Sequence, residues 1–278
     1  MSRAATRLAV LGAGKMGEAL LSGLLRAGTS PDLVVATARR PDRAALLADR
    51  YGIGVLGNAQ AVEQADVLLL AVKPQDMAAL LAEIAVVVRP THLVVSMAAG
   101  IPTSFIERRL AADVPVVRVM SNTPVLVDEA MSAISPGSLA TEEHLAAVEE
   151  LLGHVGRTIR VPEHQQDAVT ALSGSGPAYF FFLVEAMTDA GILLGLPRAV
   201  AAELLVQTAL GAAVMLRDSG EHPVQLREAV TSPAGTTINA IRELERHGVR
   251  AALIAAIEAA YDRSRELASG NEQSPPEK

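Results

Sequence analysis

Hydrophobic and polar positions divide this chain into two parts with different periodicities. In the first part, up to about residue 162, short apolar runs alternate with segments whose apolar residues recur at helical spacing. Strands are expected at residues 7–11, 33–37, 53–55, 67–72, 92–97, 116–120 and 130–135, and helices at 75–88, 103–110 and 142–152. The run at 67–72 is apolar throughout, as in a strand covered on both faces. This alternation predicts an α/β domain with a doubly wound, mainly parallel sheet.

The second part, from residue 167 to 268, shows almost no strand periodicity. Helices are expected at residues 179–194, 197–218, 224–230, 237–247 and 249–269, which predicts an all-α domain. Several are alanine-rich and apolar on more than one face, as at 199–206. Roughly a hundred residues cannot cover so much apolar helix surface, which favours an oligomer interface over a bundle docked on the first domain. We expect domains at 1–162 and 163–270 and a disordered polar tail at 271–278.

Composition narrows the function classes. The chain has 278 residues and a net charge of −7, which argues against nucleic acid as the main partner. It has no cysteine, so disulfide and thiolate chemistry are excluded, and its six histidines lack the spacing of metal ligands. There is no room for a signal peptide before the first strand, and no uncharged apolar run reaches the roughly 18 residues of a membrane span. A cytoplasmic protein without a metal site or membrane contact is expected.

A glycine motif, Gly12-Ala13-Gly14-Lys15-Met16-Gly17, directly follows the first strand and opens a helix that runs to Ala27. In this context Gly12 allows a tight turn, Gly14 lets the backbone approach a pyrophosphate, and Gly17 lets the helix pack on the strand. The helix N-terminus then faces the phosphate charge, next to Lys15 and Met16. The motif predicts a Rossmann-type dinucleotide site, with an ordinary glycine-rich turn as the alternative.

The end of the second strand indicates which dinucleotide binds. Asp32 precedes that strand, so it lies at the wrong end to bind a ribose 2′-hydroxyl. Thr37 can donate a hydrogen bond at the correct end, and Arg39 or Arg40 can pair with a 2′-phosphate. NADPH is therefore expected in preference to NADH, unless both arginines are only solvated residues that open the next helix.

Other strand ends should complete the cofactor site, because ligands of open α/β sheets bind beyond the carboxyl ends of the strands. Val72 and Lys73 should cover the cofactor, the small residues 98–100 should leave room for a nicotinamide ring, and Asn122 should position the substrate or the nicotinamide amide. The residues expected at these ends are Val72, Lys73, Pro74, Ala98, Ala99, Gly100 and Asn122.

Two segments of the helical part combine glycine, proline and hydroxyl residues at the start of a helix. They are Ser173–Ala178 and Val230–Thr237. Such a start exposes free backbone N–H groups and the positive end of the helix dipole, which can bind a small carboxylate without an arginine. Helix capping explains the first segment equally well. The second segment, Val230–Thr237, has four hydroxyl residues and a glycine in one turn, which favours a binding function.

The distribution of lysine bears on the reaction. Lysine occurs only at positions 15, 73 and 278, so the folded helical part offers no lysine general acid of the kind that 3-hydroxyacid dehydrogenases use. Reduction of a C=N bond fits this composition, because a protonated imine is already an activated electrophile and a hydroxyl can suffice to orient it.

Together these motifs make the chain resemble pyrroline-5-carboxylate reductase, over a stretch from about Arg7 to Leu267. The residues that carry the resemblance are Gly12–Gly17, Ala71–Pro74, Ala98–Gly100, Ser121–Pro124, Leu172–Tyr179 and Thr231–Thr237. The family reduces 1-pyrroline-5-carboxylate to L-proline with NAD(P)H, the last step of proline biosynthesis. Its members form dimers through interleaved C-terminal helices, and often decamers built from those dimers.

The resemblance also implies roles for single residues. The turn from Ser232 through Gly235 to Thr236 should bind the substrate carboxylate through backbone N–H groups. Thr236 should hydrogen-bond the ring nitrogen as the catalytic residue, with the adjacent Thr237 as the alternative. The resemblance further implies that Val230, Ser175 and Gly176 border the ring and that Asn58 contacts the cofactor ribose.

One departure from the family pattern concerns the substrate turn. The chain has Pro-Ala-Gly at 233–235 where many members have Pro-Gly-Gly, so alanine strains the turn if position 234 adopts a positive φ. Two other functions remain open from the sequence. One is a related imine reductase or short hydroxyacid dehydrogenase, and the other is a non-catalytic NADP(H)-binding regulator.

Overall fold

The computed structural model describes residues 6–110 and 113–272, in two compact units. One unit, here called the Rossmann unit, runs through Ser175 and includes the chain again from Ala260, and the helical unit spans Gly176–Ala259. The expected domains at 1–162 and 163–270 stay a prediction, and the compact units group residues 163–175 and 260–272 with the sheet-bearing part of the chain. Of the tail expected at 271–278, residues 273–278 lie outside the described part, and the last helix extends through Glu272.

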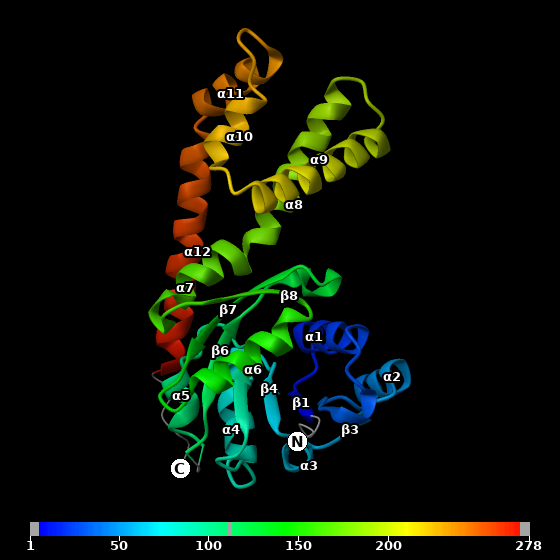
Figure 1. Ribbon diagram of the computed structural model, residues 1–278, viewed down its shortest axis with the longest axis vertical. Coiled ribbons are helices and arrows are strands. Elements are labelled where there is room, and N and C mark those ends of the chain that lie inside the picture. The colour runs from blue at the N-terminus through cyan, green and yellow to red at the C-terminus, as the bar shows by residue number, and fades with distance from the viewer. Residues whose placement is uncertain (1–5, 111–112, 273–278) are drawn as a thin grey trace. The chain divides into compact units, whose positions relative to one another are not determined.

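The Rossmann unit is built on an eight-stranded sheet with the order β3-β2-β1-β4-β5-β6-β7-β8 (Figure 1). All neighbouring strands are parallel except β6 and β7, so the predicted doubly wound, mainly parallel sheet is confirmed. The strands are β1 (Leu8–Leu11), β2 (Val34–Ala36), β3 (Gly54–Val55), β4 (Val67–Leu70), β5 (Leu93–Ser96), β6 (Val116–Met120), β7 (Ala130–Pro136) and β8 (Gly156–Arg160).

Apolar side chains of the central strands pack in two separate hydrophobic cores, one on each face of the sheet. Because side chains alternate along a strand, Leu8 and Val10 of β1 enter one core while Ala9 and Leu11 enter the other. This two-sided burial is the reason that the strands are continuously apolar. The covering helices are α1 (Lys15–Arg26), α2 (Pro41–Tyr51), α3 (Asn58–Glu63), α4 (Met77–Ile84), α5 (Thr103–Glu107), α6 (Glu142–Gly153) and α7 (Gln166–Val169).

The features of this unit that were not predicted include a strand and a helical turn. The edge strand β8 reads Gly-Arg-Thr-Ile-Arg and pairs in parallel with β7, so pairing rather than hydrophobicity makes it a strand. Residues Thr170–Gly174 form one π-helical turn between α7 and α8 (Gly176–Leu193), where the sequence suggested a break between helices. The helical path therefore continues through the motif at 173–178 instead of stopping before it.

The helical unit contains α8, α9 (Arg198–Ser219), α10 (Pro223–Ala229), α11 (Thr236–Arg246) and the start of α12 (Val249–Glu272). These bounds confirm the helices expected from the sequence to within a few residues. Helix α8 packs on α9, and a side chain at Gly191 would come within 2.8 Å of the Ala201 Cβ, so glycine allows this close approach.

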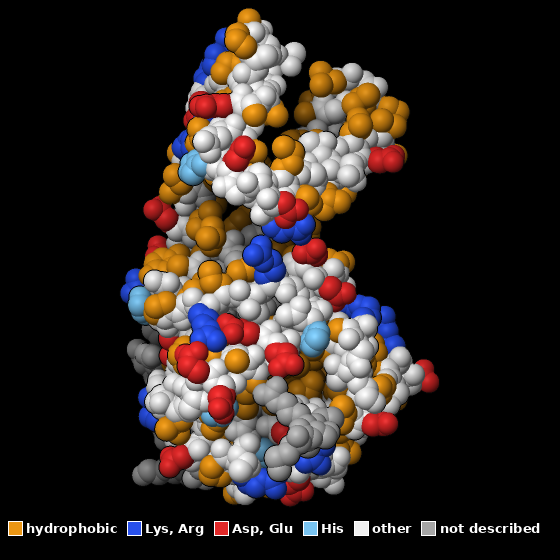
Figure 2. Space-filling model, viewed as in Figure 1, with side chains coloured by type: hydrophobic (Ala, Val, Ile, Leu, Met, Phe, Trp, Pro, Cys, Tyr) orange, Lys and Arg blue, Asp and Glu red, His pale blue; other side chains and the backbone are white. Residues whose placement is uncertain are grey.

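Large apolar side chains of the helical unit remain exposed within the chain. Phe180, Phe181 and Phe182 are each about two-thirds exposed, and Leu204 and Leu210 of α9 are more than half exposed. Figure 2 shows hydrophobic side chains gathered on the surface of this unit. By length and composition α9 could also span a membrane, a test that buried helices of soluble proteins pass as well. The uncovered apolar surface agrees with the expectation of an oligomer interface.

Candidate functional site in the Rossmann unit and the substrate turn

A cavity of about 830 Å³ opens beyond the carboxyl ends of β1, β2 and β4. In the strand order, β1 continues to β2 and β3 on one side, while β4, β5 and β6 follow on the other. The cavity therefore lies at the point where the strand order reverses, which is where open α/β sheets bind ligands. Nine of the residues expected to bind the cofactor line it: Gly12, Gly14, Lys15, Thr37, Arg39, Arg40, Asn58, Val72 and Lys73.

The three motif glycines differ in what surrounds them. Gly12 has a φ of +84°, and a Cβ there would collide with the side chain of Val72. A Cβ on Gly17 would lie 3.1 Å from the Ala71 Cβ, which shows how closely α1 packs on the strands. At Gly14 the nearest atom to an added Cβ is the Gly12 carbonyl oxygen at 4.0 Å. Gly14 thus keeps the cavity wall open to a group that approaches the backbone, as a pyrophosphate would.

Thr37 holds the glycine turn from the end of β2. Its hydroxyl oxygen accepts a hydrogen bond from the Gly12 N–H at 2.9 Å, and its carbonyl accepts one from Ala13 N–H at 2.9 Å. The side chain is only 5% exposed. The hydroxyl oxygen therefore fixes the shape of the glycine turn, and donation by the same hydroxyl to a cofactor stays a prediction.

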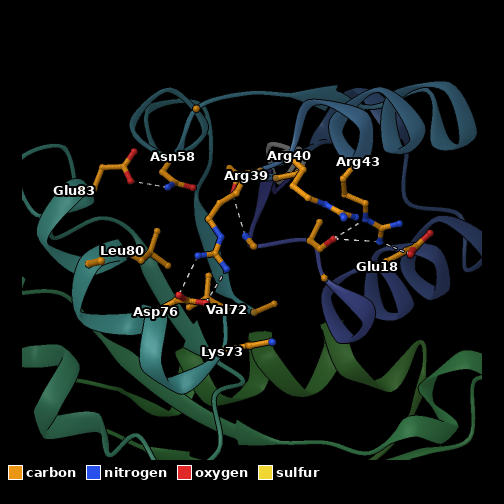
Figure 3. A pocket seen from close by; sticks show the side chains of 18 of the residues that line it. Glu18, Arg39, Arg40, Arg43, Asn58, Val72, Lys73, Asp76, Leu80 and Glu83 are labelled. Atoms are coloured by element: carbon orange, nitrogen blue, oxygen red, sulfur yellow. Dashed lines mark hydrogen bonds and ion pairs between the residues drawn. The ribbon is translucent and has the colours of Figure 1, made fainter. Parts of the chain in front are cut away.

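Three arginines follow β2 and have different partners (Figure 3). The Arg39 guanidinium donates two hydrogen bonds of 3.0 Å to the two carboxylate oxygens of Asp76. Arg40 lies 3.7 Å from Asp42 and is largely exposed. Arg43, which the sequence reading missed, donates to the Ala13 carbonyl at 3.2 Å and to the carboxylate of Glu18. Its position at the start of α2, three residues after Arg40, was the signal available in the sequence.

The cavity is basic although the chain is acidic. Its wall carries five cationic side chains, of Lys15, Lys73 and the three arginines, against the three carboxylates of Glu18, Asp76 and Glu83, which leaves a charge of +2. The whole chain has a net charge of −7. An excess of positive charge around an open glycine turn fits a dinucleotide polyphosphate.

Glu18 ties α1 to α2 beside this cavity. It accepts hydrogen bonds from Arg43, from the Tyr51 hydroxyl at 3.0 Å and from Arg50 at 3.3 Å. Burial alone would raise the pKa of the Glu18 carboxyl, but these hydrogen bonds and the arginine charges outweigh it and hold that pKa below its ordinary value. The carboxylate therefore stays ionised and fixes Arg43 against the glycine turn.

Asn58 lines the far side of the cavity, at the start of α3. Its side-chain amide donates a 2.7 Å hydrogen bond to Glu83 of α4, as Figure 3 shows. Asn58 and Glu83 are thus a second polar pair on the wall, which the sequence did not predict.

The remaining seven residues expected at the cofactor do not line this cavity. They are Met16, Gly17, Pro74, Ala98, Ala99, Gly100 and Asn122. Met16 packs on the core, and Pro74 starts a short 3₁₀ turn that ends at Asp76. Gly100 has a φ of +69°, and a Cβ there would lie 3.3 Å from the Ala268 backbone nitrogen of α12. Glycine at position 100 is therefore explained by helix packing, and its role toward a cofactor stays a prediction.

Asn122 links the start of β7 to the π-helical turn of the Rossmann unit. Its side-chain amide donates to the Ser173 carbonyl at 3.1 Å, and its side-chain oxygen accepts from the Met131 N–H at 3.0 Å. These contacts hold the end of β6 against the π-helical turn. Asn122 thus supports the π-helical turn, which is followed by Ser175 and by Gly176, the first residue of α8.

The expected substrate turn lies in the helical unit, between α10 and α11. Ala234 has a φ of +57°, in the left-handed region that favours glycine. A Cβ on Gly235 would collide with the Ser232 side chain, and the Gly235 N–H donates to the Ser232 carbonyl at 3.1 Å. Helix α11 then begins at Thr236, so the N–H groups of Thr236 and Thr237 belong to the first turn, where a helix offers them no partner of its own.

Comparisons with known proteins find similarity to pyrroline-5-carboxylate reductases over nearly the whole chain. A family model described as pyrroline-5-carboxylate reductase dimerisation matches residues 163–267, and one described as NADP oxidoreductase, coenzyme F420-dependent, matches residues 7–100. The pyrroline-5-carboxylate reductase of Corynebacterium melassecola is 47% identical over 94% of this chain and 98% of its own length. The chain belongs to the pyrroline-5-carboxylate reductase family.

Solved structures of pyrroline-5-carboxylate reductases share the fold. The enzyme from Coxiella burnetii superposes with a TM-score of 0.89, at 35% identity, over 95% of this chain and 99% of its own. That from Plasmodium falciparum, solved with NADP bound, has a TM-score of 0.86 at 26% identity, over 95% and 98% of the two chains. The architecture expected from the sequence, a Rossmann domain followed by an all-α dimerisation domain, is confirmed.

Proposed function

We propose that this protein is an NAD(P)H-dependent imine oxidoreductase that reduces the C=N bond of 1-pyrroline-5-carboxylate to give L-proline, the final step of proline biosynthesis. The observation that carries the proposal is the basic cavity with its open glycine turn, in a chain that matches reductases of this name over 94% of its length. The reaction consumes one hydride and one proton, which add to the ring carbon and the ring nitrogen.

NADPH is the preferred cofactor in this proposal, with NADH as the second. Gly12, Gly14 and Lys15 hold the pyrophosphate at the start of α1, and Arg40 pairs with the 2′-phosphate. When bound, the reduced nicotinamide supplies the hydride. Val72 and Lys73, which follow β4, cover the cofactor next to the glycine turn.

The turn that opens α11 binds the substrate. Backbone N–H groups from Ser232 through Gly235 to Thr236 hold the carboxylate, because a helix N-terminus attracts a negative charge. The Thr236 hydroxyl hydrogen-bonds the ring nitrogen and orients it, with Thr237 as the neighbouring alternative. Val230, Ser175 and Gly176 border the ring. Residues 163–270 contain no lysine, so no lysine of the helical domain supplies the proton to the nitrogen.

The protein acts in the cytoplasm as a homo-oligomer. The dimerisation model matches residues 163–267, and the apolar faces of α8 and α9 are left uncovered within the chain. We therefore place the dimer interface on the C-terminal helices, and a decamer of such dimers is the larger assembly to test.

The test is to follow the absorbance of NADPH, and separately of NADH, with racemic 1-pyrroline-5-carboxylate, and to identify the product. Oxidation of the cofactor with formation of proline is expected, and faster with NADPH at low cofactor concentration. Tight cofactor binding without oxidation would contradict the proposal and favour another imine substrate or an NADP(H)-binding regulator.

A further inference from the structure

Asp76 has a position that neither the glycine motif nor the substrate turn explains. It ends the 3₁₀ turn Pro74–Asp76 after β4, on the cavity wall opposite the end of β2. Its two carboxylate oxygens accept hydrogen bonds from the two terminal nitrogens of Arg39, both at 3.0 Å. Figure 3 shows the Arg39 side chain reaching across the cavity to Asp76 and away from Arg40.

The two adjacent arginines therefore differ in availability. The side chain of Arg39 uses both terminal nitrogens on Asp76, in the bidentate geometry with which guanidinium binds carboxylate or phosphate. Arg40 makes only a long contact of 3.7 Å with Asp42, and both of those side chains are about three-quarters exposed. A phosphate that enters this end of the cavity finds Arg40 available, but it must compete with Asp76 for Arg39.

We propose that Asp76 is a specificity-determining residue that lowers the preference of this enzyme for NADPH over NADH. This inference rests on the proposed function only in placing the 2′-phosphate beside the arginines that follow β2. Asp76 occupies the guanidinium fork of Arg39, so a 2′-phosphate must displace this carboxylate before it can pair with that guanidinium. A cofactor with a free 2′-hydroxyl carries no charge there, so it binds with the Arg39–Asp76 pair intact.

The pair is also weak enough to be displaced. The Arg39 side chain is 80% exposed and that of Asp76 is 28% exposed, and ion pairs in such positions stabilise a protein little. Asp76 therefore adjusts the affinity for a 2′-phosphate without preventing its binding. Its effect should decrease as ionic strength rises, because salt screens exposed charges.

The experiment compares Asp76→Asn with the unchanged enzyme by titration calorimetry, with adenosine 2′,5′-bisphosphate and 5′-AMP as probes. These probes differ only in the 2′-phosphate, and their binding requires no turnover. We expect the bisphosphate to bind Asp76→Asn about three- to ten-fold more tightly, the scale of one nearby charge in a solvated site, and 5′-AMP to change by less than about two-fold.

Two further variants separate Arg39 from a general charge effect. In an Arg39→Ala background the gain from Asp76→Asn should fall below about two-fold, because the pair no longer exists. Glu83→Gln removes one negative charge from the same cavity wall, where the partner is the Asn58 amide, and should give a smaller gain than Asp76→Asn. An equal gain from Glu83→Gln, an undiminished gain without Arg39, or weaker bisphosphate binding to Asp76→Asn would each overturn the proposal.

The same measurements distinguish a failure of the proposed role of Asp76 from a failure of the proposed function. A protein that binds both probes as expected but does not reduce 1-pyrroline-5-carboxylate would support the role of Asp76 and contradict the proposed function. Absence of binding by both probes to the unchanged protein would overturn the cavity as a cofactor site, and this role with it.

Discussion

At the scale of single residues, Arg39 and Arg40 are neighbours in sequence but not equivalent in structure. Arg40 is the more available cation, so Arg40→Ala should weaken NADPH binding about 10- to 100-fold, the value of one charge-assisted contact, and NADH binding far less. Arg39→Ala should have a smaller effect, because Asp76 already holds that guanidinium. Dissociation constants for both cofactors test this, and an equal loss of NADPH and NADH would contradict the 2′-phosphate assignment.

Thr236 is the residue on which the chemical step should depend. Thr236→Ala should lower turnover about 10- to 1000-fold, on the scale of one lost hydrogen bond to the reacting group, while NADPH binding stays near normal. Thr237→Ala, one position further along α11, is the matched control. A larger loss of turnover in Thr237→Ala would move the catalytic hydroxyl by one residue, and full activity of Thr236→Ala would remove Thr236 from the mechanism.

Ala234 is held in a conformation that costs an L-residue about 1–2 kcal/mol, and its φ is +57°. Ala234→Gly removes that strain but adds freedom to the unfolded chain, so a net gain of about 0.5–1 kcal/mol in the free energy of unfolding is expected. Denaturant unfolding at fixed protein concentration measures it. Gly235→Ala should act in the opposite direction, because its Cβ would collide with Ser232. A less stable Ala234→Gly protein would show that the turn does not store this strain.

At the scale of elements, the Glu18 network joins α1, which begins in the glycine motif, to α2. Glu18→Gln should lower the free energy of unfolding by about 1–3 kcal/mol at neutral pH, because Arg43 loses its charged partner. The pKa of Glu18 is lowered in the folded protein, so this stabilisation is present above the ordinary carboxyl pKa and is lost as the pH falls through the lowered value. Unfolding measured from neutral pH down to about pH 3 should show the two proteins converge in acid. A difference that persists in acid would mean that packing, not charge, is responsible.

The sequence predicted those helices and strands whose own residues carry a clear hydrophobic pattern. Strands β1 and β4 are buried on both faces, so their apolar runs predicted them, and α9 and α12 were predicted from long alanine-rich segments. Strand β8 was missed because only its pairing with β7 makes it a strand. Its sequence contains two arginines and lacks the apolar run of a buried strand, as is common at the edge of a sheet. The π-helical turn at Thr170–Gly174 was missed because a Ser-Gly motif suggests an interruption rather than a widened turn.

The candidate site shows the same division. The glycine turn was predictable because backbone conformation, close packing and room for a ligand at the backbone explain its three glycines, and all three lie within one short motif. The pairs Arg39–Asp76 and Arg43–Glu18 were not predictable, because they join residues 37 and 25 positions apart on different elements. The hydrogen bond from the Asn122 amide to the Ser173 carbonyl was also not predictable, because it joins distant parts of the chain, and the predicted role of Asn122 toward a ligand stays a prediction.

At the scale of the whole molecule, the helical unit presents an apolar surface that its own chain leaves uncovered. Exposed apolar patches of this extent mark interaction sites, and the dimerisation model that matches residues 163–267 identifies the partner as a second copy of the chain. An interface on α9 would also explain the scarcity of charge along this helix, because a helix that is packed on all sides carries apolar residues on all sides. A helix of that composition therefore does not require a membrane.

Replacing Leu204 and Leu210 of α9 together with arginine tests this assignment. Both side chains are more than half exposed within the chain, at 56% and 57%, so the change should cost little in a monomer. In a dimer it removes two buried leucines and buries two charges, which should raise the dissociation constant at least about 100-fold. Val86→Arg is the control, because Val86 is 84% exposed but belongs to the Rossmann unit. Sedimentation velocity should show monomer for the double variant and an unchanged assembly for the control. An unchanged assembly in both would exclude this face of α9 from the interface, and the uncovered phenylalanines of α8 would then be the surface to which the dimer contact has to be assigned.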